Sequence, residues 1–167
     1  MIDYEKMYRA VYKRGGLVSV LRTVDRVAVI FTVVAYAALV TLSFTSDIIK
    51  GVVCVAVSAV PFILLSIFRR VLSAPRPYEL YDFPSLGIDL PRKKSGSSFP
   101  SRHIFSSFLI GTLFLTSVPL LGAIVLLLGV GLGACRVLRG IHFIRDCIAG
   151  AVIGVVCGII GLIILSL

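Results

Sequence analysis

The chain has 167 residues, of which 58% are hydrophobic and only 15% charged, and its mean hydropathy is +1.05. A soluble domain of this length carries more charge, so the composition excludes an ordinary soluble protein and indicates an integral membrane protein. The formal net charge is +9, but no soluble nucleic-acid-binding module is visible. We therefore expect no nucleic-acid partner and favour membrane lipids and a phosphorylated substrate. The length suits one membrane-embedded domain, residues 1–167.

Residues 1–26 are predicted to form a basic segment on the membrane surface. Tyr4, Tyr8 and Val11 recur at helical spacing among lysines and arginines, a pattern typical of an interfacial helix. A poorly ordered basic tail is the alternative. The first long apolar run starts only near Val27 and lacks a small-residue cleavage site, so we expect a retained membrane helix rather than a cleaved signal peptide.

Five apolar segments follow this basic segment. They are approximately Val27–Phe44, Ile48–Phe68, Ile104–Val118, Leu120–Cys135 and Cys147–Leu165. A membrane span takes about 20 residues, so the third and fourth segments must extend into their polar flanks. The sequence therefore predicts an all-α fold: a polytopic membrane helix bundle with about five transmembrane helices plus the N-terminal interfacial helix.

Glycines recur at intervals of four residues in the last two apolar segments. They are Gly129 and Gly133 in the fourth segment, and Gly150, Gly154 and Gly158 in the fifth. This spacing lets helix backbones approach closely in lipid. We interpret it as packing within one chain, with association between chains as the alternative; the pattern sets no oligomeric state.

The polar stretch Arg69–Ser101 is the longest connection. Loops this long in small proteins are usually functional or disordered, and we predict that residues 69–101 form an active-site loop. All but one of the 17 lysines and arginines lie in the N-terminal segment, in Arg69–Arg102 or in Arg136–Arg145. Five spans place these three regions on the same side of the membrane. The positive-inside rule predicts that this side is cytoplasmic.

The sequence has only two histidines, His103 and His142, and each begins an apolar segment among arginines. Asp146 follows His142 by four residues, which places both side chains on one face of a helix. The carboxylate can then hold a proton on one imidazole nitrogen and leave the other nitrogen free to attack. A lone histidine or arginine at the interface is often only a polar anchor. An aspartate that enters a membrane segment is costly, however, so the combination favours a functional site.

His103 follows Pro100, Ser101 and Arg102, and we predict a helix start here with Ser98 as N-cap and Pro100 in the first turn. Backbone N–H groups at a helix start suit an anion, and arginine donors match phosphate oxygens. Two histidines in different surroundings can divide attack and leaving-group protonation. This pattern predicts phosphoryl transfer through a phosphohistidine. No carboxylate cluster suits a metal, so we expect neither a metal nor a cofactor.

Three motifs carry a resemblance to a known family. In order along the chain they are Arg69-x6-Arg76-Pro77, Pro100-Ser101-Arg102-His103 and Arg136-x5-His142-x3-Asp146. They resemble K-x6-R-P, P-S-G-H and S-R-x5-H-x3-D of the type-2 phosphatidate phosphatase superfamily, which also contains bacterial acid phosphatases and vanadium haloperoxidases. The resemblance implies catalytic roles for His142 as nucleophile, Asp146 as its orienting group and His103 as general acid and later base. It implies phosphate binding by Arg69, Arg76, Ser101 and Arg136, and by the backbone around Arg102.

Three positions depart from the family pattern. Arg69 stands where the family has lysine, Arg102 replaces the glycine of P-S-G-H, and Cys135 replaces a serine. Arg102 adds a side chain at the pocket mouth, where it contacts either the substrate or the membrane surface. None of the three changes removes a catalytic group. Membrane members typically have six spans, so five here indicates that one is missing.

The resemblance implies a metal-independent lipid phosphate phosphatase in the cell membrane, a bacterial inner or plasma membrane. Candidate substrates are phosphatidate, a polyprenyl phosphate or pyrophosphate, phosphatidylglycerol phosphate, and a phosphorylated glycolipid precursor. One alternative is a non-catalytic lipid-binding or scaffold protein with a degenerate phosphate pocket. Others are a phosphotransferase and a vanadate-dependent oxidase, although oxidases of that kind are soluble.

Overall fold

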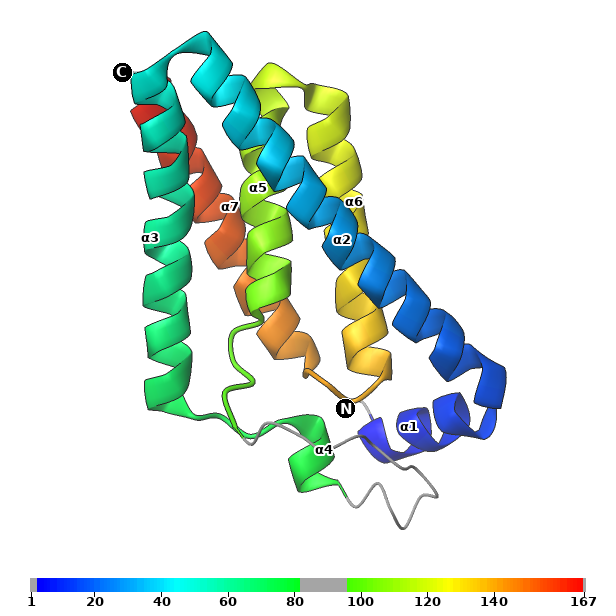
Figure 1. Ribbon diagram of the computed structural model, residues 1–167. Coiled ribbons are helices and arrows are strands. Elements are labelled where there is room, and N and C mark those ends of the chain that lie inside the picture. Colours follow the sequence, from blue (N-terminus) through cyan, green and yellow to red (C-terminus); the bar gives the residue numbers. More distant parts are fainter. Residues whose placement is uncertain (1–2, 82–95, 167) are drawn as a thin grey trace.

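The computed structural model describes residues 3–81 and 96–166, and within these ranges it contains helices and no strand (Figure 1). The helices are α1 (Tyr4–Lys13), α2 (Gly15–Ser46), α3 (Ile48–Leu72), α4 (Pro77–Leu80), α5 (Arg102–Ser117), α6 (Pro119–Leu138) and α7 (Ile144–Ser166). The predicted all-α membrane helix bundle is confirmed.

Five long helices, α2, α3, α5, α6 and α7, run up and down between the two ends of the bundle (Figure 1). Within the described ranges, four of them are long and apolar enough to cross a membrane: α2, α3, α6 and α7. The fifth, α5, has 16 residues and is about 24 Å long at 1.5 Å per residue, which is short of a hydrocarbon core of about 30 Å. It lies at the centre of the bundle and packs most extensively against α7 and α6.

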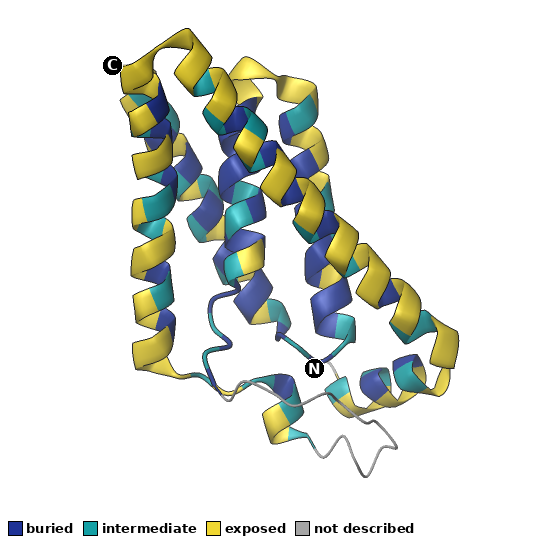
Figure 2. Cartoon of the chain, in the orientation of Figure 1, coloured by how far each residue is buried: buried dark blue, intermediate teal, exposed yellow. Residues whose placement is uncertain are grey.

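The outer face of the bundle is apolar. Large side chains such as Val27 and Val34 on α2, and Ile63 and Leu64 on α3, are exposed (Figure 2). Phe105 and other apolar residues of α5 are buried. An exposed apolar surface of this extent suits contact with lipid chains rather than with water.

The glycines of α7 allow α5 to pack closely against it. A Cβ added to Gly150 would lie 2.6 Å from the carbonyl oxygen of Ser101, and one added to Gly154 would lie 2.6 Å from that of Phe105. A Cβ on Gly158 would lie 2.6 Å from the Cβ of Thr112. These approaches are too short for any side chain, so the predicted packing within one chain is confirmed for α7.

The predicted interfacial segment 1–26 is divided between two helices. Only α1 forms a separate helix, which lies across one end of the bundle (Figure 1), and the chain turns at Arg14 before α2 begins at Gly15. Residues 15–26 extend the first membrane helix because Leu21 has an apolar partner there: it packs with Cys135 of α6 and Val11 of α1. The basic residues of this stretch therefore belong to the same helix as the first apolar segment.

The predicted loop 69–101 begins later than expected, because α3 continues to Leu72 and so includes Arg69. It also contains the short helix α4, and residues 82–95 lie outside the described residues. The alternating helix directions place α1, the end of α3 and the α6–α7 turn at the same end of the bundle (Figure 1). The three basic regions therefore share one end, as predicted.

Candidate functional site

His142 lies in the turn between α6 and α7 rather than on a helix, so the predicted shared helix face is wrong. The predicted contact between the His142 and Asp146 side chains is nevertheless present, because Asp146 lies in the first turn of α7, close to the turn that carries His142. The Nδ1 atom of His142 lies 3.5 Å from Oδ2 of Asp146, and their side chains are 2% and 0% exposed. Gly140, with φ of +70°, forms the bend that turns the chain toward α7.

Ser98 contacts both His142 and Asp146, a role that the sequence analysis missed. Its hydroxyl donates to Oδ2 of Asp146 at 2.5 Å and lies 3.3 Å from Nδ1 of His142. The same carboxylate oxygen accepts the N–H of Phe143 at 3.0 Å. Ser98 is therefore not the N-cap predicted for α5. That position belongs to Ser101, and Pro100 precedes the helix instead of lying in its first turn.

Burial lowers the pKa of His142 to about 4, and the hydrogen bond with Asp146 opposes this shift without overcoming it. The imidazole is therefore neutral at pH 7. A neutral imidazole whose Nδ1–H faces a carboxylate keeps a lone pair on Nε2, and this is the form that can attack an electrophile.

His103 lies in the first turn of α5 and is held by Arg136 of α6. The Nη1 group of Arg136 donates to Nδ1 of His103 at 2.9 Å. The backbone carbonyl of Arg136 accepts the N–H of Ile141 at 2.9 Å and that of His142 at 3.4 Å. Arg136 thus connects the two histidines through its side chain and its backbone.

Asp25 of α2 is a second residue that the sequence analysis missed. Its carboxylate accepts Nε–H of Arg136 at 2.7 Å and lies 3.2 Å from Nη1 of Arg139. The sequence does contain a signal for this role, because Asp25 is the only acidic residue between Glu5 and Asp47. Assigning residues 15–26 to the membrane surface concealed that signal.

Arg69 and Arg76 bind the backbone that surrounds the histidines. The buried guanidinium of Arg69 donates to the carbonyl groups of Ser97, Ser98 and Pro100, which lie just before α5. Arg76 donates through Nε to the carbonyl of Gly96 at 3.2 Å, and through Nη1 to that of Ile141 at 3.4 Å. Both residues are brought to the site as predicted, and each orders a segment next to a histidine.

Ser101 and Arg102 mark the start of α5. The N–H of Ser101 donates to the carbonyl of Asp146 at 2.9 Å, which fixes α5 to α7. Its hydroxyl is buried and has no hydrogen-bond partner within the part of the chain that the structure describes. Arg102 is partly exposed and points toward α3, where its guanidinium lies 5.8 Å from the ring centroid of Phe62.

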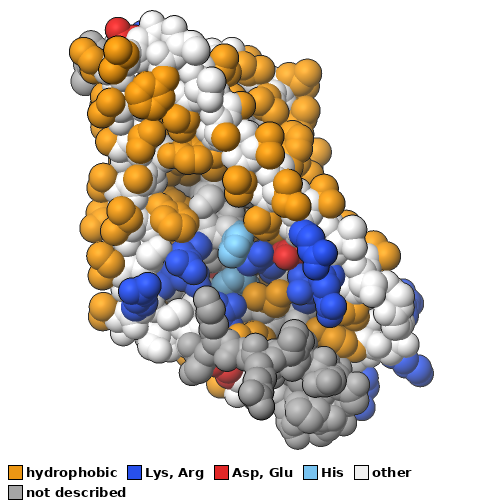
Figure 3. All heavy atoms as spheres, in the orientation of Figure 1, with side chains coloured by type: hydrophobic (Ala, Val, Ile, Leu, Met, Phe, Trp, Pro, Cys, Tyr) orange, Lys and Arg blue, Asp and Glu red, His pale blue; other side chains and the backbone are white. Residues whose placement is uncertain are grey.

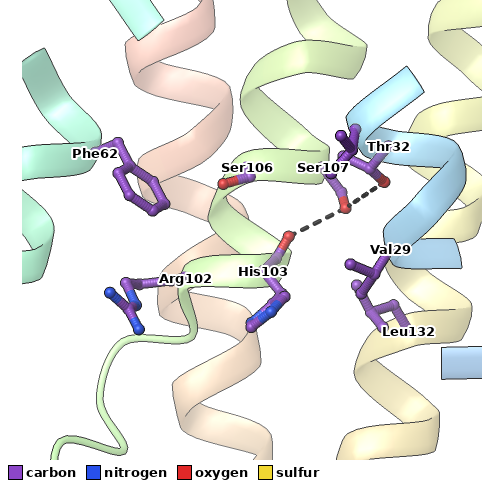
Figure 4. A pocket seen from close by; sticks show the side chains of 9 residues that line it. Val29, Thr32, Phe62, Arg102, His103, Ser106, Ser107 and Leu132 are labelled. Carbon is purple, nitrogen blue, oxygen red and sulfur yellow. Dashed lines mark hydrogen bonds between the residues drawn. The ribbon is translucent and has the colours of Figure 1, made fainter. Parts of the chain in front are cut away.

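A cavity opens beside His103, and a second cavity adjoins it between α2, α3 and α5. The first, of about 260 Å³, is lined by Val29, Thr32, Val33, Phe62, Arg102, His103, Ser106, Ser107 and Leu132 (Figure 4). The second, of about 370 Å³, shares four of these residues and continues along α5 to Leu109 and Ile110. Figure 3 shows the histidines in a hollow with basic side chains on both sides and apolar side chains above. The polar site thus opens into a largely apolar groove between the helices.

Helix α1 packs beneath the turn that carries His142. Tyr12 donates its hydroxyl to the carbonyl of Arg139 at 3.1 Å, and the ring of Tyr4 lies edge-on to that of Phe143 with centroids 5.4 Å apart. Tyr8 is fully buried, and this burial raises its pKa above the ordinary value. The apolar face of α1 therefore supports the site.

No group of three or more His, Cys, Asp or Glu side chains that could hold a metal ion occurs within residues 3–81 and 96–166. The chemistry available to the described residues is that of two imidazoles, their carboxylate and guanidinium partners, and further arginines.

Together, the fold and site define a polytopic membrane protein with paired histidines at one basic end of a helix bundle. The family model of the PAP2 superfamily matches residues 50–166. The chain belongs to the PAP2 superfamily, which confirms the resemblance inferred from the three motifs. No curated protein was found to match the chain.

The solved structures that are similar to this one include the following two. The crystal structure of the first transmembrane PAP2 type phosphatidylglycerolphosphate phosphatase from Bacillus subtilis superposes with a TM-score of 0.73 at 19% identity, over 98% of this chain and 84% of that one. The crystal structure of Aquifex aeolicus LpxE superposes with a TM-score of 0.59 at 26% identity, over 86% of this chain and 93% of that one. The chain therefore has the fold of PAP2-type membrane phosphatases.

Proposed function

We propose that this protein is a metal-independent lipid phosphate phosphatase that works through a phosphohistidine on His142. The observation that carries the proposal is the asymmetry of the two histidines. Nδ1 of His142 faces the Asp146 carboxylate, whereas Nδ1 of His103 faces the Arg136 guanidinium. The His142 imidazole is thus prepared to attack, and the His103 imidazole is held by an arginine, a type of side chain that commonly binds phosphate.

In the first step, Nε2 of His142 attacks the phosphorus atom and forms a P–N bond. The P–O bond to the leaving group breaks, and the leaving oxygen takes the electron pair together with a proton from His103. In the second step, His103 removes a proton from water, which attacks the phosphohistidine. This releases inorganic phosphate and restores His142.

In this proposal, Arg136 controls the protonation state of His103. In the substrate-free site it donates to Nδ1 of His103, which holds that imidazole neutral. A bound phosphate draws the guanidinium toward its own oxygens, which frees Nδ1 to take up a proton. Binding of the dianion thereby creates the acid that the first step needs.

Arg69, Arg76, Ser101 and Arg136 are proposed to bind the phosphoryl group that is transferred to His142. Arg102 is proposed to bind phosphate on the leaving-group side of the same site. Support for Ser101 comes from its buried hydroxyl, which lacks a partner among the described residues. The backbone N–H groups at the start of α5 add donors that favour an anion. Arg69, Arg76 and Arg136 stabilise the charge that spreads over the phosphoryl oxygens in the transition state.

The substrate is proposed to be lipid-anchored, because the groove beside His103 is lined by Val29, Val33, Phe62 and Leu132. One structural neighbour is described as a phosphatidylglycerolphosphate phosphatase. Phosphatidate, polyprenyl phosphates or pyrophosphates, and glycolipid phosphates remain members of the same proposed class. We propose that the site lies on the cytoplasmic side, because arginines and lysines are concentrated at its end of the bundle.

The test is release of inorganic phosphate from these lipid phosphates by the purified full-length protein in detergent, with His142→Ala as the inactive comparison. Arg70→Ala is the matched control, because Arg70 is exposed at the end of α3 beside the site. We expect turnover by the wild type and by Arg70→Ala, and none by His142→Ala. Full activity of His142→Ala would refute the mechanism. Lipid binding without turnover of any substrate would instead favour a non-catalytic lipid-binding protein.

A further inference from the structure

Arg102 lies beside the proposed catalytic acid and has no counter-ion among the described residues 3–81 and 96–166. Its Nη1 group donates to the hydroxyl of Ser66 at 3.5 Å, and its guanidinium lies 5.8 Å from the ring centroid of Phe62. Among the residues that the structure describes, it has no carboxylate or carbonyl partner. Arg69 and Arg76, in contrast, donate to backbone carbonyls.

The two partners of Arg102 hold the guanidinium without neutralising it. The guanidinium has five hydrogen-bond donors in a planar fork, and a ring face and one long hydroxyl contact satisfy few of them. A cation at the edge of an apolar membrane cavity is costly unless an anion joins it. Arg102 also stands where the P-S-G-H motif of the superfamily has glycine, so any ligand that it binds is a property of this chain rather than of the shared motif.

The location of Arg102 indicates which part of a substrate it meets. Arg102 and His103 line the same cavity, and Figure 4 shows both side chains at it. In the proposed function, His103 protonates the leaving oxygen, so the leaving group enters this cavity. Arg102 therefore faces the leaving group and not the phosphoryl group that His142 accepts.

We propose that Arg102 is a specificity-determining residue that binds a second phosphate on the leaving group. This inference rests on the proposed function and narrows its substrate class to lipids that carry two phosphates. The second phosphate belongs either to a lipid diphosphate or to a phosphodiester that is joined to the scissile monoester through an alcohol. In both cases Arg102 meets a negative charge that a simple lipid monophosphate lacks.

The same bonds form and break with both kinds of substrate. The terminal phosphoryl group moves to Nε2 of His142, and the leaving oxygen takes a proton from His103. A diphosphate leaves as the lipid monophosphate, and a diester-linked substrate leaves as the lipid alcohol that carries the diester. Water then releases inorganic phosphate from His142. Arg102 stabilises the phosphate that stays with the lipid.

The experiment compares two pairs of substrates with matched chains in detergent micelles. One pair is a polyprenyl diphosphate and the corresponding polyprenyl monophosphate, and the other is phosphatidylglycerol phosphate and phosphatidate. The proteins are the wild type, Arg102→Gly, which restores the motif glycine, Arg102→Lys, which keeps the charge, and Arg70→Ala as the control for surface charge.

We expect Arg102→Gly to lower kcat/KM by roughly 10- to 100-fold for one or both two-phosphate substrates, as the loss of a charge-assisted contact predicts. Its kcat/KM for the matched monophosphates should stay within about 3-fold of the wild-type value, because these substrates have no second phosphate for Arg102 to contact. Arg102→Lys should recover part of the loss, and Arg70→Ala should match the wild type. The substrate pair that responds identifies the source of the second phosphate.

Equal losses for both members of each pair would overturn the proposal, because Arg102 would then bind the transferred group or the membrane surface. No loss for any substrate would overturn it as well. A wild type that hydrolyses only the monophosphates would refute the role of Arg102 while leaving the proposed function intact. A wild type that hydrolyses none of the four substrates would count against the proposed function itself.

Discussion

The carboxylate of Asp25 accepts Nε–H of Arg136 at 2.7 Å and Nη2–H at 3.4 Å, joining α2 to α6 across 111 residues of sequence. This two-point contact uses one edge of the guanidinium and leaves Nη1 directed at Nδ1 of His103, 2.9 Å away. Asp25 therefore sets the orientation of the arginine that holds the second histidine, although Asp25 belongs to none of the three motifs.

Asp25→Asn is expected to lower kcat/KM by roughly 10- to 100-fold, because Arg136 loses the contact that orients it. The change should not add to that of Arg136→Gln, since both act on one side chain, and a double-mutant cycle of kcat/KM measures this coupling. Glu5→Gln is the control, because Glu5 forms only an exposed ion pair with Arg9. Additive losses would show that Asp25 acts independently of Arg136.

Ser98→Ala is expected to lower kcat by about 10-fold and the free energy of unfolding by about 1–3 kcal/mol, because the buried Asp146 carboxylate loses a charge-assisted hydrogen bond. KM should change little, since Ser98 lines neither cavity. Steady-state kinetics and thermal unfolding in detergent measure both effects. Thr112→Val, which removes a hydroxyl that donates to Phe108 at 2.7 Å, is the control. It should keep wild-type kcat, and an equal loss of kcat in both variants would contradict a specific role for Ser98.

The stability of the protein should fall in acid through His142. Burial lowers its pKa to about 4 in the native state, against an ordinary value of 6.5. Between these values the unfolded chain binds a proton that the native chain does not, so stability decreases as the pH falls from 6.5 to 4. The full loss is about 3 kcal/mol.

The measurement is chemical unfolding in detergent at pH 7, 6 and 5, for the wild type and for His142→Gln. The glutamine has no titratable group, so its stability should change less over this interval. Identical pH dependence in the two proteins would show that His142 is not the buried neutral group described here.

Gly154→Ala tests the packing of α7 against α5. The new Cβ would meet the carbonyl oxygen of Phe105 at 2.6 Å, so we expect a loss of about 1–3 kcal/mol in unfolding free energy. Gly131→Ala is the matched control on α6, because a Cβ there has nothing within 4 Å. It should be neutral or slightly stabilising, since alanine favours helix more than glycine does. Equal melting temperatures for both variants would contradict the close packing.

The sequence was sufficient to predict the helical bundle and the residues that meet at its basic end. Charge and apolar periodicity determine where spans begin and which ends lie together, and the motifs include both histidines and Asp146. The roles of Ser98 and Asp25 could not be predicted in this way. A serine before a helix can cap it or bind a more distant carboxylate, and only the packing of α5 against α7 selects Asp146.

The helix boundaries show the same limit. Residues 15–26 are basic enough for a membrane surface, but Leu21 packs with Cys135 and extends α2 through them. Such a contact joins residues that are far apart in sequence, so the local pattern contains no trace of it. The predicted placement of His142 on a helix failed because Gly140 turns the chain before α7 begins.

The nucleophile can be identified directly by trapping the phosphorylated protein. In the wild-type protein, rapid quenching within the first turnover of a lipid substrate labelled in its terminal phosphate should capture the label on the protein, and His142→Ala should capture none. We predict that the label is stable in base, labile in acid, and confined to the peptide that contains His142. Label on any other residue, or inversion of configuration at phosphorus as in direct attack by water, would contradict the account.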